Sequence, residues 1–472
     1  MNHSQPAIPF FLLTVGLNVV SAHYSAHATQ MGGERAVVKT VSALNDSPAL
    51  SPRSLESSPY TIADLAPLPV LLVEQQARQW ESAVQMNQPL NIGVARQIPN
   101  PSISFNQLNW TKTDHNSRVA FLTLKSAQAK ALRLNIVLES LSNTPSQHDE
   151  VLLRFKGSDG RSFESSGRSF AQQFGDWTPI VAGDVMTLEI EIPASIQPEQ
   201  LRFYLPVLSH LFVSPIDSNE EINQITKGKM NPSCEQDVAC NTDQTPGFAN
   251  IRDAVARMVF TDKGYSYLCT GTLLNNGNTP KRHLFWTAAH CISRNDVAKN
   301  LQTYWFYEAS ACQSRAINPH FVALDGGARL LYTNLKRDTS LLELKKAPPS
   351  GAFYAGWTSD AILEENNPVL GIHHPKGMLK KYAQGYLSRL FTHVNDKQWF
   401  YGVIWDKGQI DFGSSGSGLF TRDGQGNYLL RGGLYAAKFP QCSVSADSEV
   451  FYSRFSDVYP MIKQYLLPSF TP

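Results

Sequence analysis

A histidine, an aspartate and a serine, far apart in the sequence, have the neighbours expected of a group that cleaves acyl bonds. His290 lies in the motif TAAHC, Asp338 begins the motif DTSLLEL, and Ser415 lies in the glycine-rich run GSSGSG. A serine hydroxyl becomes a good nucleophile when a base removes its proton, and an imidazole oriented by a buried carboxylate is well suited to do so. The three motifs, in the order histidine, aspartate, serine, therefore indicate nucleophilic catalysis by serine.

The glycines next to Ser415 bear on a second requirement of acyl transfer, the stabilisation of an oxyanion. Glycine has no side chain and allows the backbone to turn sharply. The amides of Gly413 and Ser415 can then point at the negative charge that develops on the substrate oxygen. The sequence therefore predicts an oxyanion hole at Gly413 and Ser415.

The composition is that of a globular protein and excludes several other classes. The chain has 472 residues, 42% of them hydrophobic, and a formal net charge of +1. A charge so close to zero gives no reason to expect a nucleic acid as partner. No stretch approaches the roughly 18 apolar residues of a membrane-spanning helix, which excludes a multi-span membrane protein. Neither a C-x-x-C spacing nor a phosphate loop in a βα context occurs, so we expect no metal and no other cofactor.

The cysteines and the amino terminus indicate a secreted protein. All six cysteines lie in the second half of the chain, at Cys234, Cys240, Cys269, Cys291, Cys312 and Cys442. An even number confined to one segment is typical of a disulfide-stapled domain made for an oxidising compartment. The apolar run Ile8–Val20 precedes an A-x-A pattern at 26–28, as in a signal peptide. We therefore expect an extracellular protein, periplasmic in transit.

Short stretches of alternating apolar and polar residues must position the catalytic motifs, and they predict β-strands. In the first half they cover residues 117–125, 131–139, 150–156, 184–192 and 201–205. In the second half they cover residues 255–260, 268–274, 283–287, 303–307, 340–344 and 428–434, and residues 457–467 have helical spacing. The sequence therefore predicts an all-β protein with one helix near its carboxyl end.

These patterns divide the chain into five segments. We predict a signal peptide at 1–28, a linker or weakly ordered pro-region at 29–114, a β-rich pro-domain at 115–217, a linker with a processing site at 218–229 and a catalytic domain at 230–472. Serine, alanine, proline and glutamine dominate the second segment, which is typical of linkers. The third segment predicts a β-sandwich-like unit without a catalytic cluster.

The motifs resemble those of the trypsin-like, chymotrypsin-fold serine endopeptidases, and most closely those of the secreted bacterial lysyl endopeptidases. The resemblance covers residues 230–460, in CEQDVAC, WTAAHC, YWFYEASAC, DTSLLELKKAP, GIHHP and GSSGSG. It implies a chymotrypsin-like double β-barrel with a C-terminal helix, and protein or peptide substrates. It also implies that His290 is the general base, Asp338 its orienting carboxylate and Ser415 the nucleophile that forms an acyl-enzyme.

The resemblance further implies three disulfides, whose connectivity the cysteine spacing alone leaves open. Matching the motifs pairs Cys234 with Cys442, Cys240 with Cys312 and Cys269 with Cys291. The last pair would pin the histidine loop to a neighbouring strand. The first would tie the mature amino terminus to a loop near the substrate pocket.

The chain departs from the family pattern in several places. No Ile-Val-Gly-Gly-like segment, which activates animal trypsins, precedes the catalytic half, so activation would have to uncover the cleft instead. Gly418 stands where the bacterial family has a proline, and Tyr435 where it has a histidine. Trp405 matches a tryptophan that the family uses near the catalytic histidine, and half-buried packing within a barrel is the alternative.

Cleavage after lysine requires a carboxylate at the floor of an apolar slot. The resemblance puts Glu449 at or beside the family's aspartate, with Asp447 as the alternative. A longer carboxylate would shorten the pocket and could favour lysine, arginine or neither. Either residue could instead be an acid on a solvated loop.

A histidine pair and a basic cluster invite other interpretations. His373 and His374 resemble a metal-binding pair, but neighbours on a strand point apart, and the family carries GIHHP without a ligand site there. We expect Lys376, Lys380 and Lys381 to lie on a solvated loop.

The sequence therefore predicts a secreted serine endopeptidase, made as a precursor with its own pro-domain, that cuts proteins or peptides after lysine or arginine. We expect a monomer that has no membrane span once the signal peptide is removed. Two alternatives stay open: a catalytically silent, protease-like binding protein, and a serine endopeptidase with a different side-chain specificity.

Overall fold

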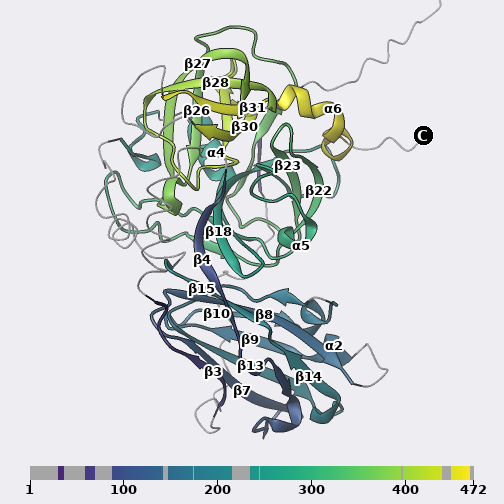
Figure 1. Cartoon of the computed structure of the whole chain (residues 1–472). Helices are drawn as coiled ribbons and strands as arrows, with labels where there is room; N and C mark the ends of the chain where they lie inside the picture. Colours follow the sequence, from purple (N-terminus) through teal and green to yellow (C-terminus); the bar gives the residue numbers. More distant parts are fainter. Residues whose placement is uncertain are drawn as a thin grey trace, which may run out of the picture.

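The computed structural model describes residues 30–36, 59–69, 88–141, 147–173, 175–214, 234–243, 245–394, 397–437 and 448–467. The expected signal peptide, the expected processing linker, Cys442 and Asp447 lie outside the described residues. The described residues form mostly β-strands in two units, drawn one below the other in Figure 1. No helix among them is long and apolar enough to cross a membrane.

The amino-terminal unit consists of two sheets around one core (Figure 1, lower half). One sheet has the order β10 (Ser162–Ser166), β9 (Leu152–Lys156), β13 (Val185–Pro193), β7 (Ser117–Ser126) and β3 (Tyr60–Leu65), with β6 (Thr111–Lys112) beside β7. The other has the order β4 (Leu90–Gln97), β15 (Val207–Leu211), β8 (Ala131–Ser140), β14 (Leu201–Tyr204) and β5 (Ser102–Ser104), with β11 (Asp176–Trp177) and β12 (Val181–Ala182) beside β8. Alternate residues such as Leu122 and Leu124 face the core, as the period of two dictates.

This unit begins earlier than the sequence suggested. Residues 88–114, expected to be linker or weakly ordered, contribute β4, β5 and β6, and β3 pairs parallel with β7. Leu90, Ile92 and Val94 are buried along β4. The alternation covers only these few residues before the proline-rich run IPNPS at 98–102 interrupts it. An alternation this short cannot be recognised as a β-strand unless the strands that pair with it are known.

In the second unit, six strands close into a ring. Their order is β29 (Gly418–Arg422), β26 (Pro368–His373), β27 (Lys381–Val394), β28 (Lys397–Lys407), β31 (Val450–Ser453) and β30 (Tyr428–Ala437), and β30 pairs with both β31 and β29. Closure leaves these strands without free edges. Strand β25 (Gly356–Thr358) continues outward from β30, and β16 (Gln236–Asp237) pairs with β27. The ring is the rigid support for the loop that carries Ser415.

A second sheet of this unit carries the histidine and aspartate motifs. It contains β21 (Val322–Leu324), β20 (Gln302–Trp305), β17 (Val255–Asp262), β18 (Tyr265–Leu274), β19 (Leu284–Thr287), β23 (Thr339–Leu344) and β22 (Ala328–Asn334), paired in that order. Helix α4 (Pro246–Ala254) leads into β17, and α5 (Asn295–Ala298) precedes β20. Near the carboxyl end, α6 (Phe455–Leu466) packs its apolar face on Trp286 and Trp357.

The two units share one continuous sheet, because β4 pairs antiparallel with β15 of its own unit and with β18 of the second unit. Beside this pairing, Arg133 of β8 is buried. Its Nε donates to Thr178 O at 2.5 Å and its Nη1 to Asn300 Oδ1 at 3.1 Å. Burial lowers the pKa of Arg133 to about 10, because the loss of water disfavours the charged form. The junction therefore contains a buried cation that bonds to both units.

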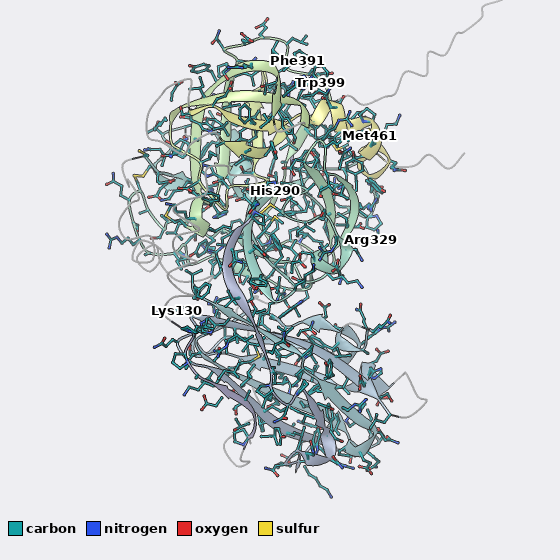
Figure 2. The ribbon with its side chains drawn as sticks, viewed as in Figure 1. Lys130, His290, Arg329, Phe391, Trp399 and Met461 are labelled. Atoms are coloured by element: carbon teal, nitrogen blue, oxygen red, sulfur yellow. A yellow bond between two sulfur atoms is a disulfide. The ribbon has the colours of Figure 1, made fainter. Side chains whose placement is uncertain are left out.

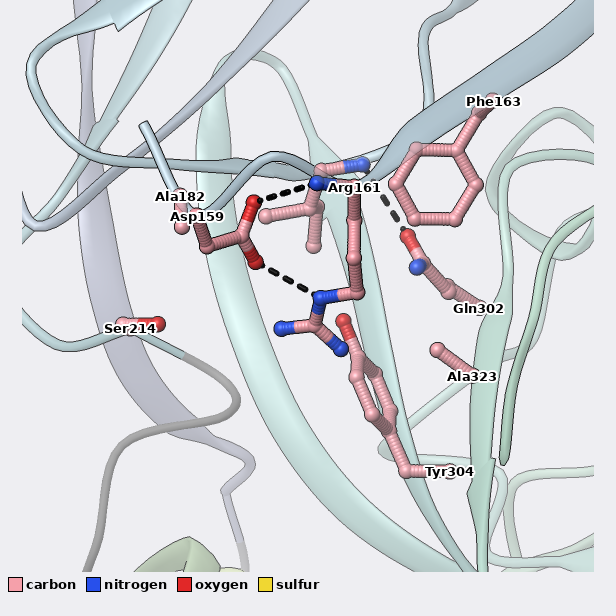
Figure 3. Close-up of a pocket in the computed structure, with 9 residues that line it drawn as sticks. Asp159, Arg161, Phe163, Ala182, Ser214, Gln302, Tyr304 and Ala323 are labelled. Carbon is pink, nitrogen blue, oxygen red and sulfur yellow. Dashed lines mark hydrogen bonds and ion pairs between the residues drawn. The ribbon is translucent and has the colours of Figure 1, made fainter. Parts of the chain in front are cut away.

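A second part of the junction is closely packed. Figure 3 shows Arg161, held by Asp159 at 2.6 Å, near Tyr304 and Gln302 of the second unit. Gln302 Oε1 accepts a hydrogen bond from the amide of Ile180 at 3.1 Å. The cavity between these residues measures about 10 Å³, which holds about one water molecule. These residues pack the two units against each other, and the cavity between them is too small for a ligand.

Two disulfides join segments of the second unit. Cys240 bonds to Cys312 and Cys269 to Cys291, the pairs that the family resemblance implies. Cys234 is also disulfide-bonded. Its expected partner, Cys442, lies outside the described residues, so that pair stays a prediction.

Replacing Cys269 and Cys291 together by alanine should lower the free energy of unfolding. The two cysteines are 22 residues apart. Without the disulfide the unfolded chain gains conformational entropy, and for a loop of this size the loss of stability is about 3 kcal/mol. Urea unfolding followed by tryptophan fluorescence measures the change. An unfolding free energy equal to that of the parent protein would contradict the prediction.

Candidate active site

The pairing of two strands brings His290 and Asp338 together. Strand β19 ends shortly before His290, β23 begins directly after Asp338, and the two strands pair antiparallel with Thr287 opposite Ser340. Asp338 Oδ1 accepts a hydrogen bond from the His290 amide at 2.9 Å, and Oδ2 lies 2.7 Å from the ring Nδ1. Figure 2 labels His290 close to where β4 reaches the second unit.

The carboxylate of Asp338 fixes the tautomer of the His290 ring. An ionised carboxylate only accepts hydrogen bonds, so Nδ1 carries a proton and Nε2 is the atom that can accept one. Nε2 has no hydrogen-bond partner among the described residues. Asp338 is 1% exposed and has a φ of 46°, a conformation that is costly for a residue other than glycine. The fold therefore maintains a strained backbone at the residue that orients this imidazole.

Ser415 lies on the loop between β28 and β29, packed against the histidine loop. Its carbonyl oxygen accepts a hydrogen bond from the Thr270 amide at 2.9 Å and lies 3.8 Å from Cys291 Sγ. The next residue, Gly416, has a φ of 81°, and a Cβ there would lie 2.3 Å from Thr287 Oγ1. Glycine is thus required for the two loops to meet. Ser415 Oγ has no hydrogen-bond partner within the described ranges.

Two amides of the serine loop are available to a ligand. The amides of residues 414, 416 and 417 donate to backbone carbonyl groups. Those of Gly413 and Ser415 donate no hydrogen bond within the part of the chain that the structure describes. Gly413 has a φ of 87°, and a Cβ there would lie 2.9 Å from His374 O. The two available amides therefore lie on either side of Ser414 in the chain. Two neighbouring N–H donors of this kind can bind an oxyanion.

Tyr435, and not Trp405, is the aromatic residue next to His290. The rings of His290 and Tyr435 have centroids 6.4 Å apart, and Tyr435 stacks on Phe400 at 4.8 Å. Trp405 is 8% exposed and packs edge-on against Tyr452, with ring centroids 6.0 Å apart. No ring contact joins Trp405 to His290 in the described ranges. Its position fits the packing role within the closed ring.

Glu449 is a buried acid with a cationic neighbour. It lies directly before β31 and is 2% exposed. Its Oε1 accepts a hydrogen bond from Ser388 Oγ at 2.8 Å and lies 3.1 Å from Arg389 Nε. A Cβ at Gly402 on β28 would lie 2.4 Å from this oxygen, so the glycine makes room for the carboxylate. The alternative of a solvated loop acid is therefore wrong for Glu449.

A cavity of about 330 Å³ adjoins His290 on the side of the amino-terminal unit. Gln88, Pro89 and Asn91 line it from that unit, and Tyr267 and Arg294 are among the residues that line it from the other. Gln88, Pro89 and Asn91 reach the site because β4 pairs with β18. No sequence motif marks Gln88, Pro89 or Asn91, which fall in the stretch 29–114, expected to be linker or weakly ordered.

The described residues offer one cluster of potential metal ligands, and it does not fit a metal. Ligand atoms of Cys269, His290 and Cys291 lie within 4.8 Å of one another. The two cysteines form a disulfide and so provide no thiolate, which is the form that binds metal.

Of the three lysines expected on a solvated loop, Lys380 and Lys381 are buried and Lys376 is half-buried, which corrects that expectation. Lys380 is 0% exposed and Lys381 is 5% exposed. Lys381 pairs with Asp237, and Lys376 Nζ lies 3.2 Å from Asp411 Oδ2. The acids come from segments far away in the sequence, so no local pattern marks these lysines as buried.

Known protein families match both units of the chain. A family model described as "Lysyl endopeptidase N-terminal domain" matches residues 64–212, and one described as "Lysyl endopeptidase, C-terminal domain" matches residues 229–453. The lysyl endopeptidase of Pseudomonas aeruginosa is 38% identical over 450 residues, which cover 93% of this chain and 94% of that protein.

Solved structures resemble about half of this chain, and more distantly. The active form of the Rv3671c protease of M. tuberculosis aligns at 14% identity with a TM-score of 0.33, over 46% of this chain and 83% of that one. The thermostable serine protease AL20 aligns at 14% identity with a TM-score of 0.33, over 46% of this chain and 97% of that one. On the near full-length relationship to the Pseudomonas protein and the match of both family models, the chain belongs to the lysyl endopeptidase family of serine endopeptidases.

Proposed function

We propose that this protein is a secreted endopeptidase precursor that cleaves peptide bonds after lysine through a His290–Asp338–Ser415 triad. The two hydrogen bonds from His290 to Asp338 beside the Ser415 loop carry this proposal. The relationship to a protein named lysyl endopeptidase supports the substrate class. The two described disulfides support export to an oxidising compartment.

The geometry suits a two-step acyl transfer. His290 Nε2 takes the proton of Ser415 Oγ as this oxygen attacks the substrate carbonyl carbon, and the amides of Gly413 and Ser415 bind the oxyanion. His290 then gives the proton to the leaving amine, and the acyl group stays on Ser415. The same nitrogen then takes a proton from a water molecule that attacks the acyl carbon, and returns it to Ser415 Oγ as the acid product leaves. Asp338 holds the ring and stabilises the imidazolium in both steps.

Replacing Asp338 by asparagine should lower kcat by about 10⁴-fold, because the amide can stabilise the wrong ring tautomer. Steady-state hydrolysis of a lysyl peptide amide by the mature enzyme measures the loss. Asp325→Asn is a matched control, since this aspartate pairs with Lys346 instead, and it should keep the parent kcat.

A fluorophosphonate probe separates the enzyme from a catalytically silent binding protein. The parent protein should be labelled on Ser415, Ser415→Ala should not be labelled, and Ser417→Ala should keep the label. Absence of label on the folded parent protein would favour the binding protein.

The proposed architecture is that of a chymotrypsin-like double β-barrel preceded by a β-sandwich-like pro-domain. The closed six-stranded ring would be one barrel and the sheet from β17 to β23 the other, with the catalytic residues between them. Gln88 and Pro89 beside His290 support a role of the amino-terminal unit in covering the cleft of the precursor. A signal peptide at 1–28 and a processing linker at 218–229 complete the proposed precursor.

The precursor should process itself at Lys227 or Lys229 if the pocket selects lysine. Ser415→Ala should then be secreted at full length, because the nucleophile is lost while the fold is barely disturbed. Immunoblotting and amino-terminal sequencing after expression in a protease-deficient host measure the outcome. Trimming of Ser415→Ala at the same lysine in that host would mean that another peptidase matures the protein.

Four substitutions identify the specificity acid. If Glu449 binds the substrate lysine, Glu449→Gln should lower kcat/KM on lysyl substrates by about 100-fold or more, because a buried ammonium loses its counter-charge. Arg389→Gln should raise it, since the competing cation is removed. Glu343→Gln is the control, as this acid is paired with Arg282 in the other sheet.

A peptide library with lysine, arginine and other residues at the cleaved position measures all these variants. Loss of the lysine preference in Asp447→Asn but not in Glu449→Gln would identify Asp447 as the acid. No change in either variant would contradict both assignments.

A further inference from the structure

The loop that carries the proposed oxyanion amides is held by the residues that follow β26. The Lys376 amide donates to Phe412 O at 2.5 Å, and Lys376 Nζ lies 3.2 Å from Asp411 Oδ2. On the other side, Thr270 Oγ1 donates to Gly413 O at 2.8 Å. The main chain of residues 411–413 is therefore fixed at several points just before the catalytic serine.

Ser414, between the two available amides, is fixed by its side chain. Its Oγ lies 2.9 Å from Nδ1 of His373, the last residue of β26, and accepts a hydrogen bond from the Asp411 amide at 3.2 Å. Ser414 and His373 are both 0% exposed. The serine hydroxyl thus links the loop to a rigid strand of the closed ring.

The imidazole of His373 is suited to a permanent contact. Burial, and then the charge of Lys381, lowers the pKa of His373 to about 3. The ring therefore stays neutral over the pH range in which a serine endopeptidase works. Other charged groups in this cluster include Glu235, Asp237, Lys376 and Asp411, and burial raises the pKa of Glu235 to about 8. Burial also raises the pKa of Asp411, so charges near the contact can change with pH while the His373 ring itself stays neutral.

We propose that His373 is a positioning residue for the oxyanion hole, which acts by holding Ser414 so that the amides of Gly413 and Ser415 converge on one point. This inference rests on the proposed function of Ser415. Rotation of the Ser414 backbone changes the direction of the Ser415 amide relative to that of Gly413, because Ser414 lies between them in the chain. Oxyanion donors act at about 2.7–3.1 Å, and a displacement of about 1 Å lowers the rate by about 10²-fold.

Replacing either partner should therefore slow the chemical step and leave substrate binding largely intact. His373→Phe and Ser414→Ala should each lower kcat by about 10- to 100-fold on a lysyl peptide amide, with KM within about threefold of the parent value. The double variant should be no slower than the slower single variant, because the two residues act through one contact. Affinity for a peptide aldehyde, whose adduct carries the oxyanion, should fall in parallel with kcat.

Two further variants distinguish positioning from general packing. His373→Asn keeps a polar atom at the place of Nδ1, and should recover most of the lost kcat. His374→Phe is the matched control: His374 is equally buried and adjacent, but its Nδ1 bonds to Met378 O at 3.0 Å instead of to the serine loop. His374→Phe should lower the melting temperature and keep kcat within about threefold.

The mature enzyme, with all disulfides, is used throughout, and active sites are counted by fluorophosphonate labelling. Parent values of kcat in both His373→Phe and Ser414→Ala would overturn the proposal, as would additive losses in the double variant or an equal loss in His374→Phe. If His373→Phe does not fold, Ser414→Ala and His373→Asn decide by the same criteria. Failure of the parent protein to label would contradict the proposed function itself, whereas slow but complete labelling of His373→Phe supports positioning.

Discussion

The active site depends on the hydrogen bonds that one buried carboxylate, that of Asp338, accepts. A carboxylate removed from water is costly unless charge-assisted hydrogen bonds replace its hydration. The amide and the ring of His290 supply such bonds. They can do so only because β19 and β23 pair in the register that places Thr287 opposite Ser340. The same pairing therefore stabilises the sheet and orients the proposed base.

Three histidines have the same side chain but different roles, because they differ in burial and in hydrogen-bond partner. His290 bonds through Nδ1 to an acid and has its side chain 10% exposed, so Nε2 remains for a substrate. His373 and His374 are fully buried and have lowered pKa values, so their rings act as fixed polar groups. Within the motif GIHHP, it is the ring of His373 that bonds to the serine loop. The two rings bond to different partners, Ser414 and Met378, as expected of neighbours whose side chains point apart.

The sequence predicted the features that short motifs encode. His290, Asp338 and Ser415 lie in motifs of a few residues, and the structure brings the loops that carry them together. Features that depend on distant partners were missed. Strand β4 has too few alternating residues to be recognised without β15 and β18, and Lys381 is buried because Asp237 lies beside it. The ion pair of Glu449 with Arg389 likewise joins two segments that only the closed ring brings together.

The junction of the two units constrains how such a precursor becomes active. Strand β4 pairs with β18, Arg133 bonds to Asn300, and Ser209 Oγ lies 2.8 Å from Ser266 Oγ. None of these contacts passes through the linker at 218–229, so a cut in the linker leaves them in place. The cut does remove the high effective concentration that keeps the units together. In the proposed precursor, the lifetime of the pairing between β4 and β18, and not the cut alone, would then determine when the side of His290 that faces the amino-terminal unit becomes accessible. Because Arg133 is buried, its desolvation offsets part of the energy that its hydrogen bonds contribute to the junction.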